Sequence, residues 1–145
     1  MPAKSAAERD YVLEEQVGHV LRRAHQRASA IFMEIMAEHK LTPTQFAALA
    51  KIGDEGSVSQ NRLGRLTAMD PATMQGVVRR LIARGLVGRD HDPGDRRHTL
   101  LGLTAEGRRL VARAIAPGKK VTAETLAPLD RAEQAAFLRL LKRLT

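Results

Sequence analysis

The stretch from Asp70 to Thr104 constrains the fold of this chain more than any other part of the sequence. It opens with Asp70-Pro71, an N-cap residue followed by a proline at the first helical position, which predicts the start of a helix. Apolar residues then recur at spacings of three and four, so the helix has one face for the core. These residues are Met74, Val77, Val78, Leu81 and Ile82.

Short polar and cationic residues occupy the other face of this predicted helix. Such side chains read base edges and hold phosphates in complexes with DNA. The candidates for DNA contact are therefore Thr73, Gln75, Gly76, Arg79 and Arg80.

A basic hairpin is predicted directly after the helix. Gly85 lies where a left-handed cap is expected, and residues 86–89 and 99–103 have the pattern of two short strands. Between them, Asp92-Pro93-Gly94-Asp95 favours a tight turn, and two arginines follow it at once. A helix followed by such a hairpin predicts a mainly α fold, a winged helix-turn-helix with a two-stranded β wing. The alternative is a surface helix and an ordinary hairpin in an enzyme.

The charge of the chain is concentrated in this same half. The formal net charge is +8, and residues 62–113 contain eleven Arg, no Lys and five acidic residues, which leaves +6 there. An Arg cluster suits bidentate contacts and insertion into a narrow groove. Aromatic residues make up only 3% of the chain and Trp is absent, so platforms for stacking single-stranded bases are few. The composition therefore favours double-stranded DNA as partner.

Other sequence features limit the remaining functional classes. With 145 residues the chain is expected to form one domain, and it has no cysteine for disulfides or thiol-based sensing. No apolar run approaches the length of a membrane span, and residues 1–7 have the composition of a disordered leader without an apolar core. We expect a cytoplasmic protein without a cofactor.

The rest of the chain predicts helices on both sides of the hairpin unit. One long helix is expected over residues 8–38, followed by helices over 43–52 and 59–66. A helix restarts at Thr104, is interrupted or kinked at Pro117-Gly118 and resumes over 121–126, and Asp130 caps the last one. The length of the first helix and the apolar C-terminus predict that a second subunit covers them.

The motif of the wing and the following helix resembles that of a known family. Asp92-Pro93-Gly94-Asp95-Arg96-Arg97 leads into Leu103-Thr104-Ala105-Glu106-Gly107, as in the MarR family of bacterial transcription regulators. The resemblance runs from about Tyr11 to Leu144. It implies a homodimer that sets two recognition helices into successive major grooves of a pseudo-palindromic operator. Residues 8–38 and 104–145 would then be dimerisation helices, and 43–103 the DNA-binding lobe of a single 1–145 domain.

The resemblance also implies roles for individual residues. Arg97 would enter the minor groove, Arg96 would contact a phosphate or the groove nearby, and Asp95, with Asp92, would support the wing. Contacts with phosphates are expected at the start of the preceding helix. The residues are Ser59, Gln60 and Asn61.

A small anionic aromatic ligand is the expected effector. The segments 14–19 and 21–27 resemble the branch of the family that controls catabolism of aromatic acids, including nicotinate-type compounds. Charge-assisted bonds from the first helix could hold a carboxylate while its apolar stripe packs the ring. The candidate ligand-binding residues are His19, Arg22, Arg23 and His25.

Three alternatives stay open at this point. A metal-responsive regulator would use the five histidines, for example His91 and His98 facing each other across the wing, although no His-Glu-x-x-His spacing is present. A non-specific architectural DNA-binding protein would have a steep salt dependence and little specificity. An enzyme is disfavoured, since there is no glycine-rich phosphate loop or nucleophile elbow.

Overall fold

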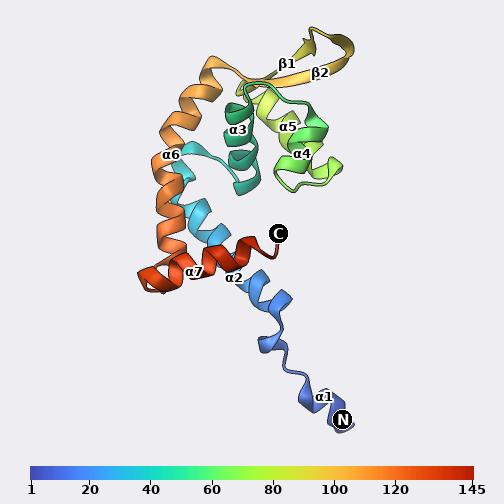
Figure 1. Cartoon of the computed structure of the whole chain (residues 1–145), viewed down its shortest axis with the longest axis vertical. Helices are drawn as coiled ribbons and strands as arrows, with labels where there is room; N and C mark the ends of the chain where they lie inside the picture. Colours follow the sequence, from blue (N-terminus) through green and yellow to red (C-terminus); the bar gives the residue numbers. More distant parts are fainter.

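The computed structural model describes all 145 residues, Met1–Thr145. Figure 1 shows a lobe that contains the hairpin, joined to two long helices that lie side by side, with an N-terminal arm projecting away from the body. The lobe consists of three helices and one two-stranded antiparallel sheet. Its elements are α3 (Pro43–Glu55), α4 (Gln60–Leu66), α5 (Pro71–Ala83), β1 (Val87–Asp92) and β2 (Asp95–Leu103).

This lobe is the winged helix-turn-helix that the sequence predicts. Helix α5 begins after Asp70, and Gly85 follows it with φ at 71°. The strands pair from Val87 with Leu103 to His91 with Thr99, so they extend closer to the turn than expected. A β-bridge joins Val58, in the loop between α3 and α4, to Leu101 of β2. The wing is thereby attached to the helices on both sides.

One apolar core holds the lobe and the long helices together. Seventeen buried hydrophobic residues form a single cluster that draws on α2, α3, α4, α5, the sheet and α6. Its central side chains are almost fully inaccessible to solvent. They include Met36, Leu49, Ile52, Leu63, Met74, Val78, Leu81 and Leu101.

The single long helix predicted over residues 8–38 is wrong. The segment divides into α1 (Ala6–Asp10), the 3-10 turn Leu13–Glu15, α2 (Val17–Ile35) and a second 3-10 turn, Ala37–His39. The backbone is extended at Tyr11 and Gln16. No residue before α2 is buried, so tertiary packing does not stabilise a helix in the arm. A helix without such packing is only marginally stable in water, and the continuous helix is therefore not formed. At the other end the chain turns so that Met36 and Leu41 enter the core.

The interruption predicted at Pro117-Gly118 is also wrong. Helix α6 (Ala105–Leu126) runs through Pro117 without a break. Packing against α2 and α3 on one side compensates for the missing donor. The absence of a side chain at Gly118 allows this approach, since a Cβ there would lie 3.3 Å from the Phe46 ring and 3.6 Å from Met36.

The last helix, α7 (Arg131–Lys142), folds back across α2 (Figure 1). It buries none of its residues, although it carries several large apolar side chains. Together with α2 it borders an open, apolar groove of about 460 Å³. The groove is lined by Val17, Val20, Leu21, Phe137, Leu140, Leu141, Arg143 and Leu144. None of the helices is both long and apolar enough to cross a membrane.

Candidate nucleic-acid interface

Helix α5 is fixed at its start by Asp70 and along its length by the core. The Asp70 carboxylate accepts hydrogen bonds from the Thr73 backbone N–H (2.9 Å) and the Thr73 hydroxyl (2.8 Å). These bonds, that of the backbone N–H above all, lower the pKa of Asp70 below its ordinary value. Met74 and Val78 are buried on the inner face. The outer face is therefore presented to a partner in a defined orientation.

The outer face of α5 carries the residues that sequence reasoning selected. Thr73, Gln75, Arg79 and Arg80 are exposed, and Gly76 is half-buried. Arg80 folds back along the helix, and a Cβ on Gly76 would lie 3.2 Å from its Nη1. The glycine thus leaves room for the Arg80 guanidinium to lie flat against the helix. A guanidinium is a group suited to guanine edges and phosphates.

Two of the residues at the start of α4 make hydrogen bonds within the fold that the sequence does not indicate. The Ser59 hydroxyl accepts a hydrogen bond from the Arg62 backbone N–H (3.2 Å) and so caps the helix. Gln60 Oε1 accepts a hydrogen bond from Arg89 Nη2 (3.1 Å), which links α4 to β1. Asn61 is exposed and makes no side-chain hydrogen bond within the chain. Of the three predicted phosphate contacts, only Asn61 is unengaged.

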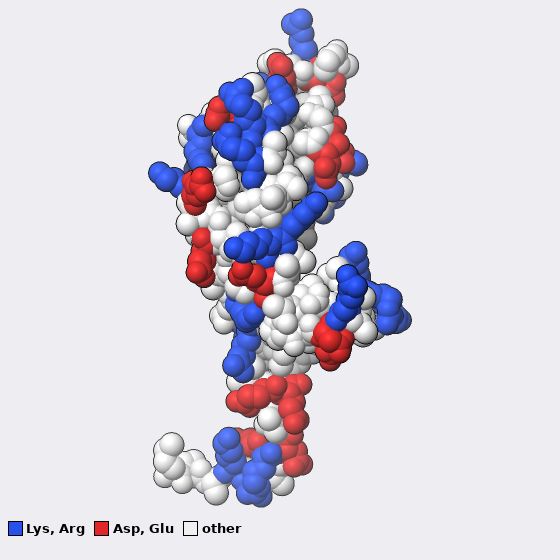
Figure 2. All heavy atoms as spheres, turned by 90° about the vertical axis from the view of Figure 1, so that its left-hand side faces the viewer, with Lys and Arg blue, Asp and Glu red and all other residues white.

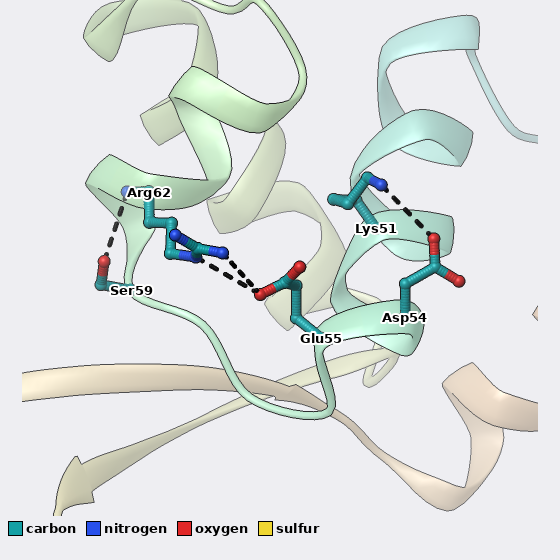
Figure 3. A network of polar contacts seen from close by, with 5 residues as sticks. All are labelled: Lys51, Asp54, Glu55, Ser59 and Arg62. Carbon is teal, nitrogen blue, oxygen red and sulfur yellow. Dashed lines mark hydrogen bonds and ion pairs between the residues drawn. The ribbon is translucent and has the colours of Figure 1, made fainter.

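Figure 3 shows a polar network that the sequence did not reveal. Arg62 donates from Nε and Nη2 to Glu55 Oε2, at 3.3 and 3.2 Å, and joins the end of α3 to the start of α4. Next to it, Lys51 Nζ lies 3.5 Å from Asp54 Oδ2. Arg62 and Arg89 are further cations of this surface, and the sequence motifs do not show their partners, which lie 7 and 29 residues away.

The wing is a tight turn with two exposed arginines. Asp92 Oδ1 accepts a hydrogen bond from the Gly94 N–H at 2.9 Å and closes the turn. Asp95 Oδ1 accepts from the Arg97 backbone N–H (3.0 Å) and from Arg97 Nε (3.3 Å), and the backbone bond is the main cause of its lowered pKa. The Arg97 side chain nevertheless remains 90% exposed, and Arg96 is exposed as well. The carboxylates thus orient a cationic tip that is free to enter a groove.

The wing and α5 are joined through the start of α6. Thr104 Oγ1 donates to the Gly85 carbonyl (2.6 Å) and accepts from the Gly107 N–H (3.0 Å), while the Thr104 N–H donates to the Leu86 carbonyl (3.1 Å). Gly107 packs against the same carbonyl of Leu86, where no Cβ would fit. This geometry explains the Thr-x-x-Gly part of the motif, which holds the wing in a fixed relation to α5.

Lys and Arg side chains gather on the α6 side of the molecule. Figure 2 shows Lys and Arg side chains grouped over the upper half of the molecule on its α6 side, whereas Asp and Glu are most closely grouped where the arm leaves the body. The acidic residues of the arm include Asp10, Glu14 and Glu15. Residues 62–113, which include α5, the wing and most of α4, carry a net charge of +6, so this part of the chain attracts a polyanion.

The four candidate ligand residues separate on α2. His19, Arg22 and Arg23 follow at spacings of three and four along α2, where His19 is half-buried and the two arginines are exposed. None of the four candidates makes a hydrogen bond or ion pair within the chain. His25 instead lines a cavity of about 550 Å³ between α2, the end of α6 and α7. Apolar residues form most of its walls. They include Leu21, Ala24, Ala28, Leu126, Leu129, Phe137 and Leu141.

The histidines do not converge. The structure contains no group of three or more His, Asp or Glu side chains that could hold a metal ion. His91 pairs with Thr99 across the hairpin, so His98, the neighbour of Thr99, points to the opposite face. His98 Nε2 lies 3.6 Å from Asp95 Oδ2 instead.

Comparison with known proteins identifies the family. The MarR family model matches residues 41–99, from the start of α3 into the wing. The transcriptional repressor NicR of Pseudomonas putida is 40% identical over 134 residues, which cover 92% of this chain and 85% of NicR. This chain belongs to the MarR family. It is a DNA-binding regulator of transcription, as the wing motif predicts.

Solved structures of MarR-family relatives agree with the fold over nearly the whole chain. BpsR of Bordetella bronchiseptica, whose DNA binding is regulated by 6-hydroxynicotinic acid, is 42% identical, with a TM-score of 0.88 over 92% of this chain and 96% of BpsR. PcaV of Streptomyces coelicolor, solved with its natural ligand, is 34% identical, with a TM-score of 0.84 over 92% of this chain and 94% of PcaV. The resemblance to the aromatic-acid branch of the family is confirmed.

Proposed function

We propose that this MarR-family chain is a homodimeric repressor that leaves its operator when a small aromatic or N-heteroaromatic carboxylate binds. The observation that carries the proposal is the combination of an exposed cationic wing tip with a recognition helix held rigidly by the core. Arg97 at the tip and Thr73, Gln75, Arg79 and Arg80 on α5 then read one half-site. In this account the chain has no catalytic role, and it works in the cytoplasm, where its operator is.

A second copy of the chain is the proposed occupant of the uncovered apolar face. The groove between α2 and α7 is lined almost entirely by large hydrophobic side chains, of which Val17 and Leu144 are 66% and 70% exposed. Contiguous apolar surface of this kind is typical of a subunit interface. Segments 17–35 and 105–142 of both subunits then form the dimerisation part, and residues 43–103 form the DNA-binding lobe.

The proposed effector site is the cavity beside His25. Its volume is in the range of small-molecule sites, and its apolar walls suit an aromatic ring. His25 lines this cavity, and Arg22 lies one turn before it on α2, so the two can share a carboxylate. Regulation of the DNA binding of the relative BpsR by 6-hydroxynicotinic acid supports this ligand class.

A direct connection between α2 and the recognition helix supports ligand control. Arg84, just after α5, donates from Nη1 to the Lys40 carbonyl (2.8 Å) and from Nη2 to the His39 carbonyl (3.0 Å). Both carbonyls lie where the chain leaves α2 for the lobe. In the proposed mechanism, α2 and α7 have a DNA-competent and a released arrangement. A ligand that binds one of them more tightly shifts the equilibrium and changes the separation of the recognition helices.

The experiment that tests this proposal compares two neighbouring arginines. Operator binding by the dimer is followed by fluorescence anisotropy while 6-hydroxynicotinic acid is added to wild type, Arg22→Gln and Arg23→Gln. Both variants lose one exposed positive charge. Only Arg22, three residues before His25, is its neighbour on the helix surface, because residues two apart such as Arg23 and His25 do not face each other. We expect Arg22→Gln to need about tenfold more acid for release than Arg23→Gln. Equal shifts in the two variants would contradict the site. Release by zinc instead of the acid would support a metal-responsive regulator, and equal binding to scrambled DNA would support an architectural protein.

A further inference from the structure

Asp70, the N-cap residue of the recognition helix α5, accepts two hydrogen bonds from Thr73. One oxygen of Asp70 accepts the Thr73 backbone N–H, and the other accepts the Thr73 hydroxyl at 2.8 Å. The second bond is additional to ordinary N-capping, which needs only the backbone bond. It fixes both the side-chain rotamer of Thr73 and the direction of its hydroxyl proton.

The direction of this proton changes what Thr73 can recognise. A threonine hydroxyl is normally both donor and acceptor and pairs with any base edge. Asp70 is ionised at neutral pH, as an aspartate is by default, and the hydrogen bonds from Thr73 lower its pKa further. An ionised carboxylate only accepts, so the hydroxyl proton is committed to it. What remains free on Thr73 Oγ1 is an acceptor lone pair.

Thr73 is also positioned to meet a base. It is exposed and lies in the first turn of α5, the part of a recognition helix that contacts base edges in the major groove. Adenine and cytosine present an amino group in the major groove, whereas guanine O6 and thymine O4 are acceptors. If a hydroxyl that can only accept faces guanine O6 or thymine O4, neither the hydroxyl oxygen nor the base oxygen finds a donor.

We propose that Thr73 is a specificity-determining residue that accepts a hydrogen bond from adenine N6 or cytosine N4 in each half-site, and that Asp70 is its positioning residue. This inference rests on the proposed operator-specific binding. It predicts one operator position in each half-site where adenine or cytosine is preferred over guanine or thymine. The preference is about tenfold, as expected for one hydrogen bond with an unpaired alternative.

The experiment measures the binding of the dimer to operator variants that carry each of the four bases at every position. Thr73→Val keeps the shape of the side chain and removes the hydroxyl, so the preference should disappear at the position that Thr73 faces and nowhere else. Persistence of the full wild-type profile in Thr73→Val would overturn the inference.

Asp70→Asn is the more discriminating variant. Asparagine is as good an N-cap as aspartate, and its oxygen can still accept the Thr73 N–H. Its NH₂ group then donates to Thr73 Oγ1 and releases the hydroxyl proton toward the DNA. The preference at that position should change to guanine or thymine. Because the variant also removes a negative charge, its affinity for all DNA rises together, and the informative quantity is the ratio between bases.

The double variant Asp70→Asn/Thr73→Val is the matched control. If Asp70 acts through the hydroxyl, its base profile equals that of Thr73→Val alone. An adenine or cytosine preference that survives Asp70→Asn would overturn the positioning role. Failure of the proposed function gives a separate result, since wild type would then bind operator and scrambled DNA equally.

Discussion

Substitution of Gly107 by alanine tests the physical meaning of the wing motif. Gly107 lies in the first turn of α6, and a Cβ there would collide with the Leu86 carbonyl oxygen and lie 3.0 Å from its carbonyl carbon. The collision is with backbone, so no side-chain rotation relieves it. Helix α6 has to move away from Leu86, which strains the Thr104 N–H bond to the same carbonyl and the buried contact of Leu110.

The size of the effect follows from three contributions. Overpacking in a rigid site costs about 1–3 kcal/mol. Weakening the Thr104 hydrogen bond costs about 1 kcal/mol more. Replacing glycine by alanine within a helix stabilises it by up to about 1 kcal/mol. We therefore expect the free energy of unfolding of Gly107→Ala to fall by roughly 2 kcal/mol.

Urea unfolding followed by circular dichroism measures this change, at equal subunit concentration for each protein because a dimer is stabilised by concentration. Gly76→Ala is the matched control, since it is also a helical glycine, but its only close neighbour is the flexible end of Arg80. This control should be as stable as wild type or more so. A Gly107→Ala midpoint at or above that of wild type would refute the close-approach argument.

Three further predictions concern the DNA contacts, the dimer and pH. Arg97→Ala should weaken operator binding by about 1–3 kcal/mol and reduce its salt dependence, while Arg131→Ala, at the start of α7, should change neither; equal affinities in fluorescence anisotropy would remove the wing from the interface. Phe137→Asp places a charge in the apolar groove and should shift the chain toward monomer in sedimentation experiments; an unchanged dimer would show that another surface joins the subunits. The pKa values of Asp70 and Asp95 are lowered in the folded chain, so their hydrogen bonds stabilise it above the unfolded pKa of about 4, and this stabilisation is lost as the pH falls through the folded values. When the pH is lowered below about 4, the urea midpoint should therefore fall, and it should fall less in Asp95→Asn than in wild type. An equal fall in Asp95→Asn and wild type would contradict the role of Asp95.

The lobe could be predicted from the sequence because its signals are local. Asp70, Thr104 and Asp92 each accept a hydrogen bond from a backbone N–H two or three residues further on, so the pattern of residue types is enough to predict these caps and the turn. The same holds for the support of Arg97 by Asp95. Such contacts form in the same way whatever the rest of the chain does.

The features that the sequence did not predict depend on distant contacts. Pro117 is tolerated because α2 and α3 pack against α6, and the first helix is broken because the arm before α2 buries no residue. Helical periodicity contains neither piece of information. Likewise, the sequence did not predict the hydrogen bond between Arg89 and Gln60, which are 29 residues apart in sequence. This bond depends on the β-bridge that brings the wing to α4.

The most direct test of the account is binding of the wild-type dimer to DNA from upstream of its own gene, measured by fluorescence anisotropy against scrambled DNA at physiological salt. Aromatic carboxylates, with 6-hydroxynicotinic acid among them, are then added to the complex. The account predicts operator binding at least about a thousandfold tighter than binding to scrambled DNA, and release by one of the acids. Equal affinity for both DNAs, or a complex that none of the acids dissociates, would contradict it.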